Sequence, residues 1–268
     1  MSSIATAIIT CDRTKFDPPS ANYFRDMCKS MERSGFRDQL EEADRFGIFD
    51  AGPQDPKWMD WMPHLKTELW CGPMKGRLDL LRNTHRAMTW MVTTGCDYGI
   101  LLSDDFICCK NWLPEVRRWL DDPTVPRPAA CYALCARYPW TRHRAHLEQR
   151  WASYPLDDFY CAIVAYPMAV LRDYLVSTLR VWVEAWINKS DWIPRDYARL
   201  HGLPIYAHCP DLFQHIGVES SLGHKHPAGP HDLMFPGEDF DALDGDYAGL
   251  PDDTAVMAAW RQVKEGKA

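Results

Sequence analysis

The residues Tyr98–Phe106, YGILLSDDF, are the stretch of sequence that decides the fold. They begin as a short apolar run, long enough for one buried strand, and end in two adjacent carboxylates, Asp104 and Asp105. A buried parallel strand with acidic groups at its C-terminal end delivers them where α/β proteins place ligands. A divalent cation with phosphate oxygens favours such a site, because one or two carboxylates leave coordination positions open. An acidic pair after a strand is also a common turn or helix cap, so the rest of the chain decides between these interpretations.

Strand and helix patterns alternate on both sides of this stretch. Apolar runs predict strands at Ile4–Thr10, Arg45–Asp50, Ala129–Ala136, Phe159–Tyr166 and Pro204–His208. Helical spacing and helix start or stop signals predict helices over Ala21–Met31, Leu78–Val92, Asn111–Leu120, Pro167–Leu179, Ser190 to Gly202, and Thr254–Val263. The segment Ala51–Pro73, rich in Pro, Trp and Gly, is expected to be irregular and at the surface. The alternation predicts an α/β fold with a mostly parallel mixed central sheet flanked by helices.

The size and charge of the chain narrow its class. Its 268 residues show no internal repeat and no linker, so we expect a single domain over 1–268. The net charge of −7 argues against a general nucleic-acid binder. The charge is uneven, however, because Lys110–Arg150 holds eight basic and four acidic residues. Within it, Arg137–Arg150 interleaves basic residues with Tyr138 and Trp140, which suits a phosphate-bearing or nucleobase-bearing partner, or a solvated basic loop.

The cysteines and apolar runs predict a cytoplasmic protein without a membrane segment. The ten Cys lie singly, adjacent or in apolar runs, so we expect free, mostly buried thiols in a reducing compartment. A zinc site is weakly signalled, because Cys131 and Cys135 lack a second pair and His224 and His226 are an isolated doublet. We also expect no signal peptide. The longest apolar run, Cys161–Leu171, is far below the ~20 residues of a membrane span.

The late part of the chain carries the most specific pattern: Lys189-Ser190-Asp191-Trp192, Ile205-Tyr206, Asp211-Leu212-Phe213-Gln214-His215-Ile216-Gly217 and Ser220-Ser221-Leu222. With the strand–helix alternation and the carboxylate pair, it resembles a GT-A type glycosyltransferase. The C-terminal half is similar to the catalytic domain of N-acetylglucosaminyltransferase IV-like enzymes. The resemblance also touches Arg82-Asn83 and Leu101–Asp105, and covers about half of the chain.

The resemblance implies a metal site and a catalytic base. Ser103-Asp104-Asp105 would stand for the Asp-x-Asp motif that holds Mn²⁺ or Mg²⁺ on a nucleotide diphosphate. Because the first Asp of the motif is Ser here, metal ligation would rest on Asp105, with Asp104 near the donor ribose or sugar. His215 matches the C-terminal His that completes the metal site, and Asp191 matches the catalytic base of inverting members.

The resemblance also implies how a nucleotide-sugar donor would bind. Ser220, Ser221 and Lys225 would approach the diphosphate, and Thr10, Arg13 and Asn83 would surround the nucleoside. Residues 1–105 would form the nucleotide-binding half, 106–225 the acceptor and metal-completing half, and 226–268 an irregular tail. One departure concerns the acceptor side, where Cys161 stands at the place of an expected Gly.

Sugar transfer from a nucleotide diphosphate requires groups that bind a cation and a group that acts as a base. The leaving diphosphate must be neutralised, which a bound cation does, and the acceptor hydroxyl needs a base within hydrogen-bond reach. Asp191 at a helix start can be that base, although Asp is also a preferred helix cap. His215 can likewise be a ligand or a core histidine.

We therefore expect a metal-dependent, inverting hexosyl- or N-acetylhexosaminyltransferase that uses a nucleotide sugar, with UDP as the expected nucleotide. The acceptor hydroxyl would lie on a glycan or on a hydroxymethylpyrimidine in DNA, which would have to be flipped out of the duplex. Two alternatives stay open: a metal-dependent nucleotidyl or phosphoryl transferase, and a non-catalytic carbohydrate-binding protein whose 12 Trp provide stacking platforms. The sequence does not give the oligomeric state.

Overall fold

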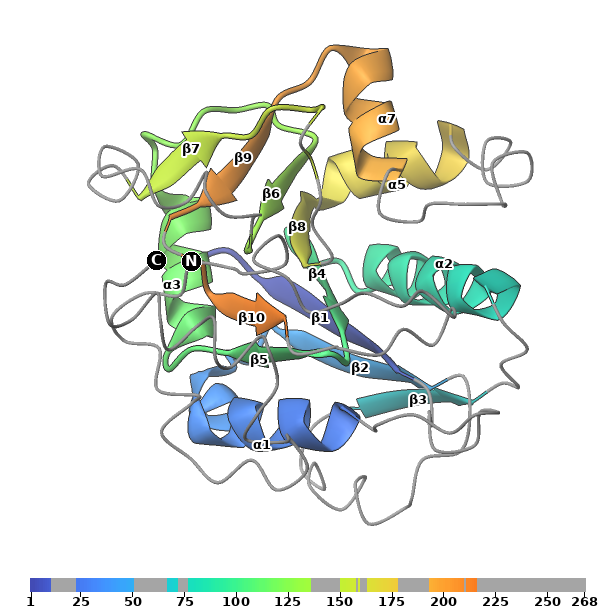
Figure 1. The fold of residues 1–268 in the computed structure, drawn as a ribbon, viewed down its shortest axis with the longest axis vertical. Helices are drawn as coiled ribbons and strands as arrows, with labels where there is room; N and C mark the ends of the chain where they lie inside the picture. Colours follow the sequence, from blue (N-terminus) through green and yellow to red (C-terminus); the bar gives the residue numbers. More distant parts are fainter. Residues whose placement is uncertain are drawn as a thin grey trace, which may run out of the picture.

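The computed structural model describes residues 1–10, 23–50, 67–71, 77–135, 150–157, 159, 163–177, 193–209 and 211–215 (Figure 1). The strands are β1 Ile4–Thr10, β2 Arg45–Asp50, β3 Thr67–Cys71, β4 Tyr98–Ser103, β5 Phe106–Cys108, β6 Cys131–Ala133, β7 Trp151–Ser153, β8 Val164–Pro167, β9 Ile205–His208 and β10 Phe213–His215. The helices are α1 Phe24–Arg33, the 3-10 helix η2 Phe36–Gln39, α2 Arg77–Thr93, α3 Trp112–Asp121, α5 Met168–Ser177 and α7 Ile193–His201.

The central sheet has the strand order β3-β2-β1-β4-β8-β6-β9-β7, and β5 and β10 form a separate two-stranded sheet. The first four strands are parallel, β8 runs antiparallel to both β4 and β6, β9 is parallel to β6, and β7 is antiparallel to β9. The chain moves outward from β1 through β2 to β3 and then returns to place β4 on the other side of β1. The strand order therefore reverses between β1 and β4.

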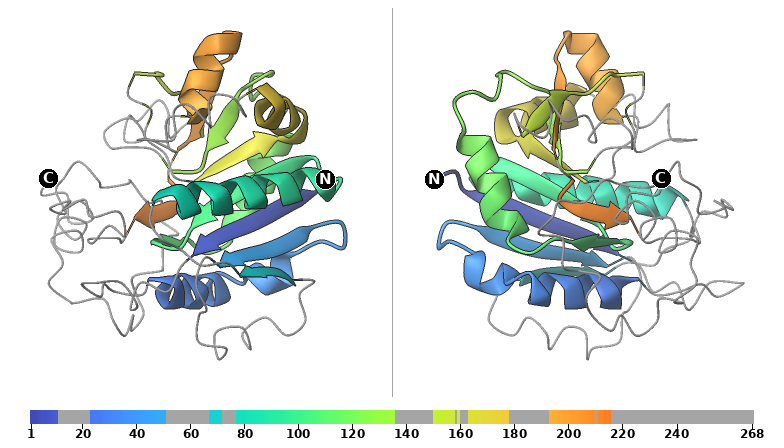
Figure 2. Two further views of the ribbon diagram at one scale, coloured as in Figure 1. Left: turned by 90° about the vertical axis from the view of Figure 1, so that its right-hand side faces the viewer. Right: turned by 60° about the vertical axis from the view of Figure 1, so that its left-hand side comes forward.

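The central parallel strands β1 and β4 are nearly continuous apolar runs because both faces of the sheet are covered there. All seven residues of β1 are buried. On one face, α2 packs against β1, β2 and β4, and α5 packs against β8 and β4 (Figure 2). On the other face, Trp112 of α3 stacks on Phe36 of η2 at 5.4 Å and meets Phe213 of β10 at 5.0 Å. This layering confirms the predicted α/β class and the mixed sheet.

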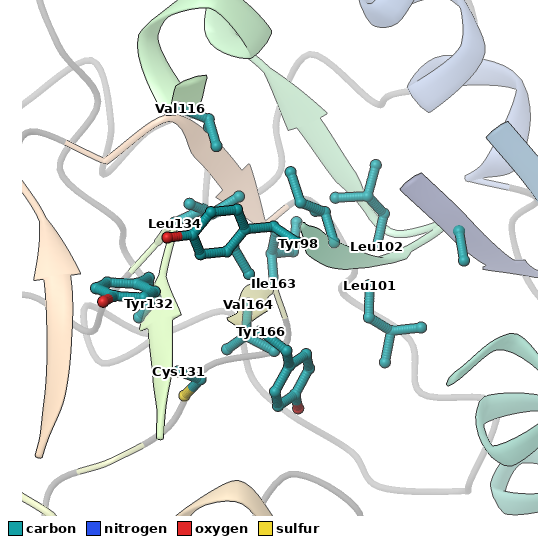
Figure 3. Packing of buried hydrophobic residues seen from close by; sticks show 14 of the residues in the cluster. Tyr98, Leu101, Leu102, Val116, Cys131, Tyr132, Leu134, Ile163, Val164 and Tyr166 are labelled. Carbon is teal, nitrogen blue, oxygen red and sulfur yellow. The ribbon is translucent and has the colours of Figure 1, made fainter. Parts of the chain in front are cut away.

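The antiparallel strand β8 joins the parallel half of the sheet to the C-terminal half. Leu101 of β4 pairs with Val164 of β8, and Tyr132 of β6 pairs with Ala165. The Tyr98 and Tyr132 rings lie 6.3 Å apart, and Figure 3 shows them beside Val164 in one continuous apolar cluster. The two halves of the described fold therefore share a core.

Close packing of α2 on the sheet gives one stability prediction. A Cβ on Gly47 would lie 3.0 Å from the Phe49 ring and 3.1 Å from the Trp90 ring, and neither rigid ring can yield easily. A Cβ on Gly99 would lie 2.9 Å from the flexible Met91 thioether. We expect Gly47→Ala to lower the free energy of unfolding by about 1–3 kcal/mol. Denaturant titration should show a smaller loss for Gly99→Ala, and the reverse order would contradict this packing.

Most predicted elements are confirmed, and several bounds are corrected. The prediction of an irregular segment over Ala51–Pro73 is wrong at Thr67–Cys71, which forms β3. The strands predicted over Ala129–Ala136 and Phe159–Tyr166 are shorter, as β6 and β8. Strand β10 was not predicted. The helix proposed over Thr254–Val263 lies outside the described residues.

The cysteine and membrane expectations can be checked where the structure describes the chain. The side chains of seven Cys are described, and each is buried and outside any disulfide: Cys28, Cys96, Cys108, Cys109, Cys131, Cys135 and Cys209. Within the same residues, no helix is long and apolar enough to cross a membrane.

Candidate functional site

Thr10 and Asp104 meet at the point where the strand order reverses. The register pairs Ile9 with Ser103, so the ends of β1 and β4 lie side by side. The Thr10 hydroxyl donates a 2.8 Å hydrogen bond to Asp104 Oδ2, and the two residues are only 4% and 3% exposed. In open α/β sheets the ligand crevice forms outside the carboxyl ends of the strands at such a switch point. The structure therefore places two of the predicted residues together where a ligand site is expected.

Asp105 lies next to this buried pair and differs from it in exposure. Asp104 and Asp105 form the turn between β4 and β5, and Asp105 is only partly buried. The hydrogen bond from Thr10 fixes one carboxylate inside the fold, while the next one keeps contact with solvent. A partly exposed carboxylate at the carboxyl edge is the oxygen donor that Mg²⁺ or Mn²⁺ accepts alongside phosphate oxygens. The residues present at this turn fit the implied cation.

The two-stranded sheet brings the C-terminal part of the chain to the same turn. Strand β10 pairs antiparallel with β5, and the register sets His215 opposite Phe106, the residue that follows Asp105. Directly opposed residues in an antiparallel pair have Cα atoms within about 5.5 Å of each other. The backbone of residue 215 is thus a neighbour of the carboxylate turn, as the predicted metal site requires. Its side chain lies outside the described part of the structure.

Asn83 is buried on α2, at the carboxyl end of β2. The side chain is 3% exposed, and its amide nitrogen donates to the backbone carbonyl of Phe49. Phe49 on β2 pairs with Ile9, the second-last residue of β1, so this contact lies at the carboxyl ends of both strands. Within the described residues, Asn83 Oδ1 has no hydrogen-bond partner, although a buried unsatisfied acceptor costs about 1–3 kcal/mol. The amide therefore offers one acceptor oxygen near the ends of β1 and β2.

The other predicted site residues fall outside the described part of the chain. They are Arg13, Asp191, Ser220, Ser221 and Lys225. Helix α7 begins at Ile193, two residues after Asp191, and Gly202 follows it with a φ of 62°. The predicted helix and its glycine stop are confirmed, whereas the position of the Asp191 side chain stays a prediction.

The structure also buries carboxylates to which the sequence analysis assigned no individual role. Asp26 in the first turn of α1 is 4% exposed, and Asp211 is fully buried. Burial raises the pKa of the Cys28 thiol, with smaller contributions from Asp104, Glu32 and Asp26. Asp26 gave no sequence signal, because an acidic residue in a first helical turn is ordinary.

A second polar cluster lies at the carboxyl end of β9. The fully buried His208 has its Nε2 3.2 Å from Glu115 Oε1, and the Trp119 ring meets the His208 ring edge to face at 5.1 Å. Burial raises the pKa of Glu115, but hydrogen bonds from His208 and Arg118 outweigh it, so the pKa falls to about 2. These groups satisfy one another between α3 and β9, and we interpret them as structural.

Metal ligation can be tested only where side chains are described. There, no three His, Cys, Asp or Glu side chains lie close enough together to hold a metal ion. That set includes Asp104 and Asp105 but not the His215 side chain. The weak zinc expectation at Cys131 and Cys135 finds no support, because the two buried residues belong to no such group within the described side chains.

Comparisons with known proteins give a likeness to solved structures alone. No protein-family model matches the sequence, and no curated protein matches it. The galactosyltransferase LgtC in complex with donor and acceptor sugar analogs is similar over 72% of this chain and 69% of its own, at 13% identity and a TM-score of 0.43. A structure of an active-site mutant of LgtC covers 70% and 68%, at 15% identity and a TM-score of 0.42. At these values the likeness carries no argument about function, which is therefore argued from the site.

One control variant tests the importance of the buried hydrogen bond. Thr10→Val removes the donor to Asp104 and should cost about 1–3 kcal/mol of stability, because the acceptor stays buried. Thr6 lies on the same strand, is equally buried, and its Oγ1 has no hydrogen-bond partner within the described residues. Thr6→Val should therefore be neutral or stabilising in thermal unfolding. Equal losses for both variants would show that the Thr10–Asp104 bond contributes nothing specific.

Proposed function

We propose that this chain is a metal-dependent glycosyltransferase that moves a sugar from a nucleotide diphosphate, with a UDP-sugar as the expected donor, to an acceptor hydroxyl. The observation that carries the proposal is the Thr10–Asp104 pair at the strand-order reversal. Asp105 follows the pair directly, and the backbone of residue 215 returns beside it. A buried carboxylate, a partly exposed one and a returning strand together suit a cation on a diphosphate.

In the proposed site, the two carboxylates of the turn have different roles. Asp105, completed by His215, would hold Mn²⁺ or Mg²⁺. When bound, this cation neutralises charge on the diphosphate leaving group. Asp104 is oriented by the Thr10 hydroxyl, so its carboxylate can accept a hydrogen bond from a ribose or sugar hydroxyl. In this arrangement Thr10 positions Asp104, and Asp104 orients the donor.

The nucleoside would bind over the ends of β1 and β2. The Asn83 nitrogen is engaged by the Phe49 carbonyl, so the side chain presents its oxygen as an acceptor. That oxygen suits an N–H of the base or a ribose hydroxyl. Arg13, after β1, would add a cation on the same side, and Ser220, Ser221 and Lys225 would reach the diphosphate.

The acceptor would bind over the C-terminal half of the sheet. We propose Asp191, just before α7, as the base that takes the proton from the acceptor hydroxyl in an inverting transfer. A glycan is the proposed acceptor. A hydroxymethylated base in DNA is the other one, because the basic and aromatic stretch Arg137–Trp151 suits phosphates, although the net charge of −7 weighs against it.

Product analysis separates this proposal from phosphoryl transfer. The protein is incubated with Mn²⁺ and a panel of UDP-sugars, with and without small glycans or hydroxymethylated DNA, and released UDP is measured. Release of UDP that increases with an acceptor supports sugar transfer. Release of pyrophosphate from a nucleoside triphosphate, with no UDP from any UDP-sugar, would overturn it in favour of a nucleotidyl transferase.

A further inference from the structure

Helix α1 supports the two-stranded sheet that follows the carboxylate turn. It packs against β5, and Ser30 Oγ accepts a 3.0 Å hydrogen bond from the backbone N–H of Cys108. Strand β5 pairs with β10, so α1 lies beneath the ribbon formed by these two strands, as Figure 1 shows. The same ribbon begins directly after Asp105 and ends at His215. The packing of α1 against β5 therefore affects how rigidly the Asp104–Asp105 turn is held.

Asp26 is an unusual residue one helical turn before Ser30, and so on the face of α1 that meets β5. It is 4% exposed, and within the described residues its Oδ1 has no hydrogen-bond partner. Asp104, which is equally buried, receives the Thr10 hydroxyl. A buried carboxylate without a hydrogen bond is costly, and it usually shifts its pKa to become neutral. Burial indeed raises the pKa of Asp26 to about 6, although nearby Lys29 and Arg25 act in the opposite direction.

The surroundings of Asp26 connect it electrostatically to the turn. Asp26 and Asp104 both raise the pKa of the Cys28 thiol, so both carboxylates lie within electrostatic range of one buried group. Lys29 and Arg25 act directly on Asp26. The Cys28 thiol, which Asp26 influences, is also influenced by Glu32 on α1 and Asp104 in the turn. Within this set, Lys29 and Arg25 are the cations that favour an ionised Asp26.

We propose that Asp26 is a positioning residue whose protonation controls how tightly α1 holds the β5–β10 ribbon, and hence the Asp104–Asp105 turn. When neutral, the carboxyl group stays in the buried contact between α1 and β5. When ionised, it is stabilised by water, and it favours openings that separate α1 from the ribbon. The inference depends on the proposed function only for what the turn binds.

The direction of the effect follows from linkage. The pKa of Asp26 is about 6 in the folded protein, against 3.8 for an ordinary Asp, so the folded state binds the proton more tightly. The stabilising contribution of the neutral carboxyl is complete below about pH 4 and is lost as the pH rises through about 6. The ribbon should therefore open more readily at pH 8 than at pH 5.

Hydrogen exchange of β5 and β10 tests the proposal without any ligand. Exchange of Phe106–Cys108 and Phe213–His215 is measured from pH 5 to pH 8 and corrected for the intrinsic rate. In the wild-type protein we expect the opening equilibrium to rise about tenfold between pH 5 and pH 8, the factor set by a pKa of about 6 one unit above the starting pH. Asp26→Asn keeps the shape and stays neutral, so its profile should be flat. Asp38→Asn, an exposed change on η2, should follow the wild type.

Each outcome of these measurements either supports or overturns the proposed role of Asp26. An equal rise in the wild type and in Asp26→Asn would overturn the proposal, as would a rise that extends equally over β1 and β2. Failure of Asp26→Asn to fold would also contradict it, because a neutral amide is expected to stabilise the fold at pH 7. Calorimetry with UDP and Mn²⁺ at pH 8 is a separate readout. Tighter UDP binding by Asp26→Asn than by the wild type would show that ionisation of Asp26 also weakens ligand binding at the Asp104–Asp105 turn. Absence of UDP binding would count against the proposed function and leave the exchange result standing.

Discussion

Asp105→Asn will abolish Mn²⁺-dependent binding of UDP and leave the fold intact. Asp105 is the partly exposed carboxylate of the turn, and Asn keeps its size but removes the charge that a hard cation requires. Loss of even a residue that only orients a metal ligand lowers metal affinity about 10- to 100-fold, so loss of a ligand should exceed that range. Isothermal titration of UDP in Mn²⁺ measures the change, and circular dichroism checks the fold.

The matched control for Asp105→Asn is Asp38→Asn. Asp38 is exposed on η2, whose Phe36 packs against Phe46 near the start of β2, the end of the strand away from the carboxylate turn. The same loss of one negative charge there should leave UDP affinity unchanged. Wild-type affinity in Asp105→Asn would show that Asp105 is not a metal ligand.

Asp191→Asn will keep donor binding and lose sugar transfer. If Asp191 takes the proton from the acceptor hydroxyl, its amide analogue cannot, and general base catalysis contributes about 10²- to 10⁴-fold. The turnover number should fall by this factor, whereas the affinity for UDP in Mn²⁺ should match the wild type. Steady-state kinetics with acceptor and calorimetry with UDP separate the two effects.

Asp196→Asn controls for the alternative that Asp191 only caps α7. Asp196 lies in the first turn of α7, is exposed, and pairs with Arg195 at 3.0 Å. Removing its charge affects the same end of the helix and should leave turnover near the wild-type value. Normal transfer by Asp191→Asn, or equal losses in both variants, would assign Asp191 a structural role.

The parts of the fold that could be predicted are those with a strong apolar signal. Ile4–Thr10 and Tyr98–Ser103 are covered on both faces, so their sequences are nearly continuous apolar runs. The end of such a strand is also well defined, which is why the carboxylate turn could be located from Asp104 and Asp105. The hydrogen bond between Thr10 and Asp104 then follows from β1 and β4 being neighbours.

The parts that could not be predicted lack a local signal. Strand β3 is an edge strand with the sequence TELWC inside a segment rich in Pro and Trp, and β10 has three residues. Both are strands because a neighbour pairs with them: β2 in one case and β5 in the other. The burial of Asp26 is likewise a result of tertiary packing, since its place in the first turn of α1 looks favourable in sequence.

The measurement that tests the central claim most directly is calorimetric titration of UDP into the wild-type protein, once with Mn²⁺ and once with a chelator. The account predicts saturable 1:1 binding with Mn²⁺ and at least about tenfold weaker binding without it, because the cation links the diphosphate to the carboxylate turn. Equal binding under both conditions would contradict metal dependence. No binding under either condition, repeated with GDP, CMP and dTDP, would contradict a nucleotide-sugar site at the β1–β4 switch point.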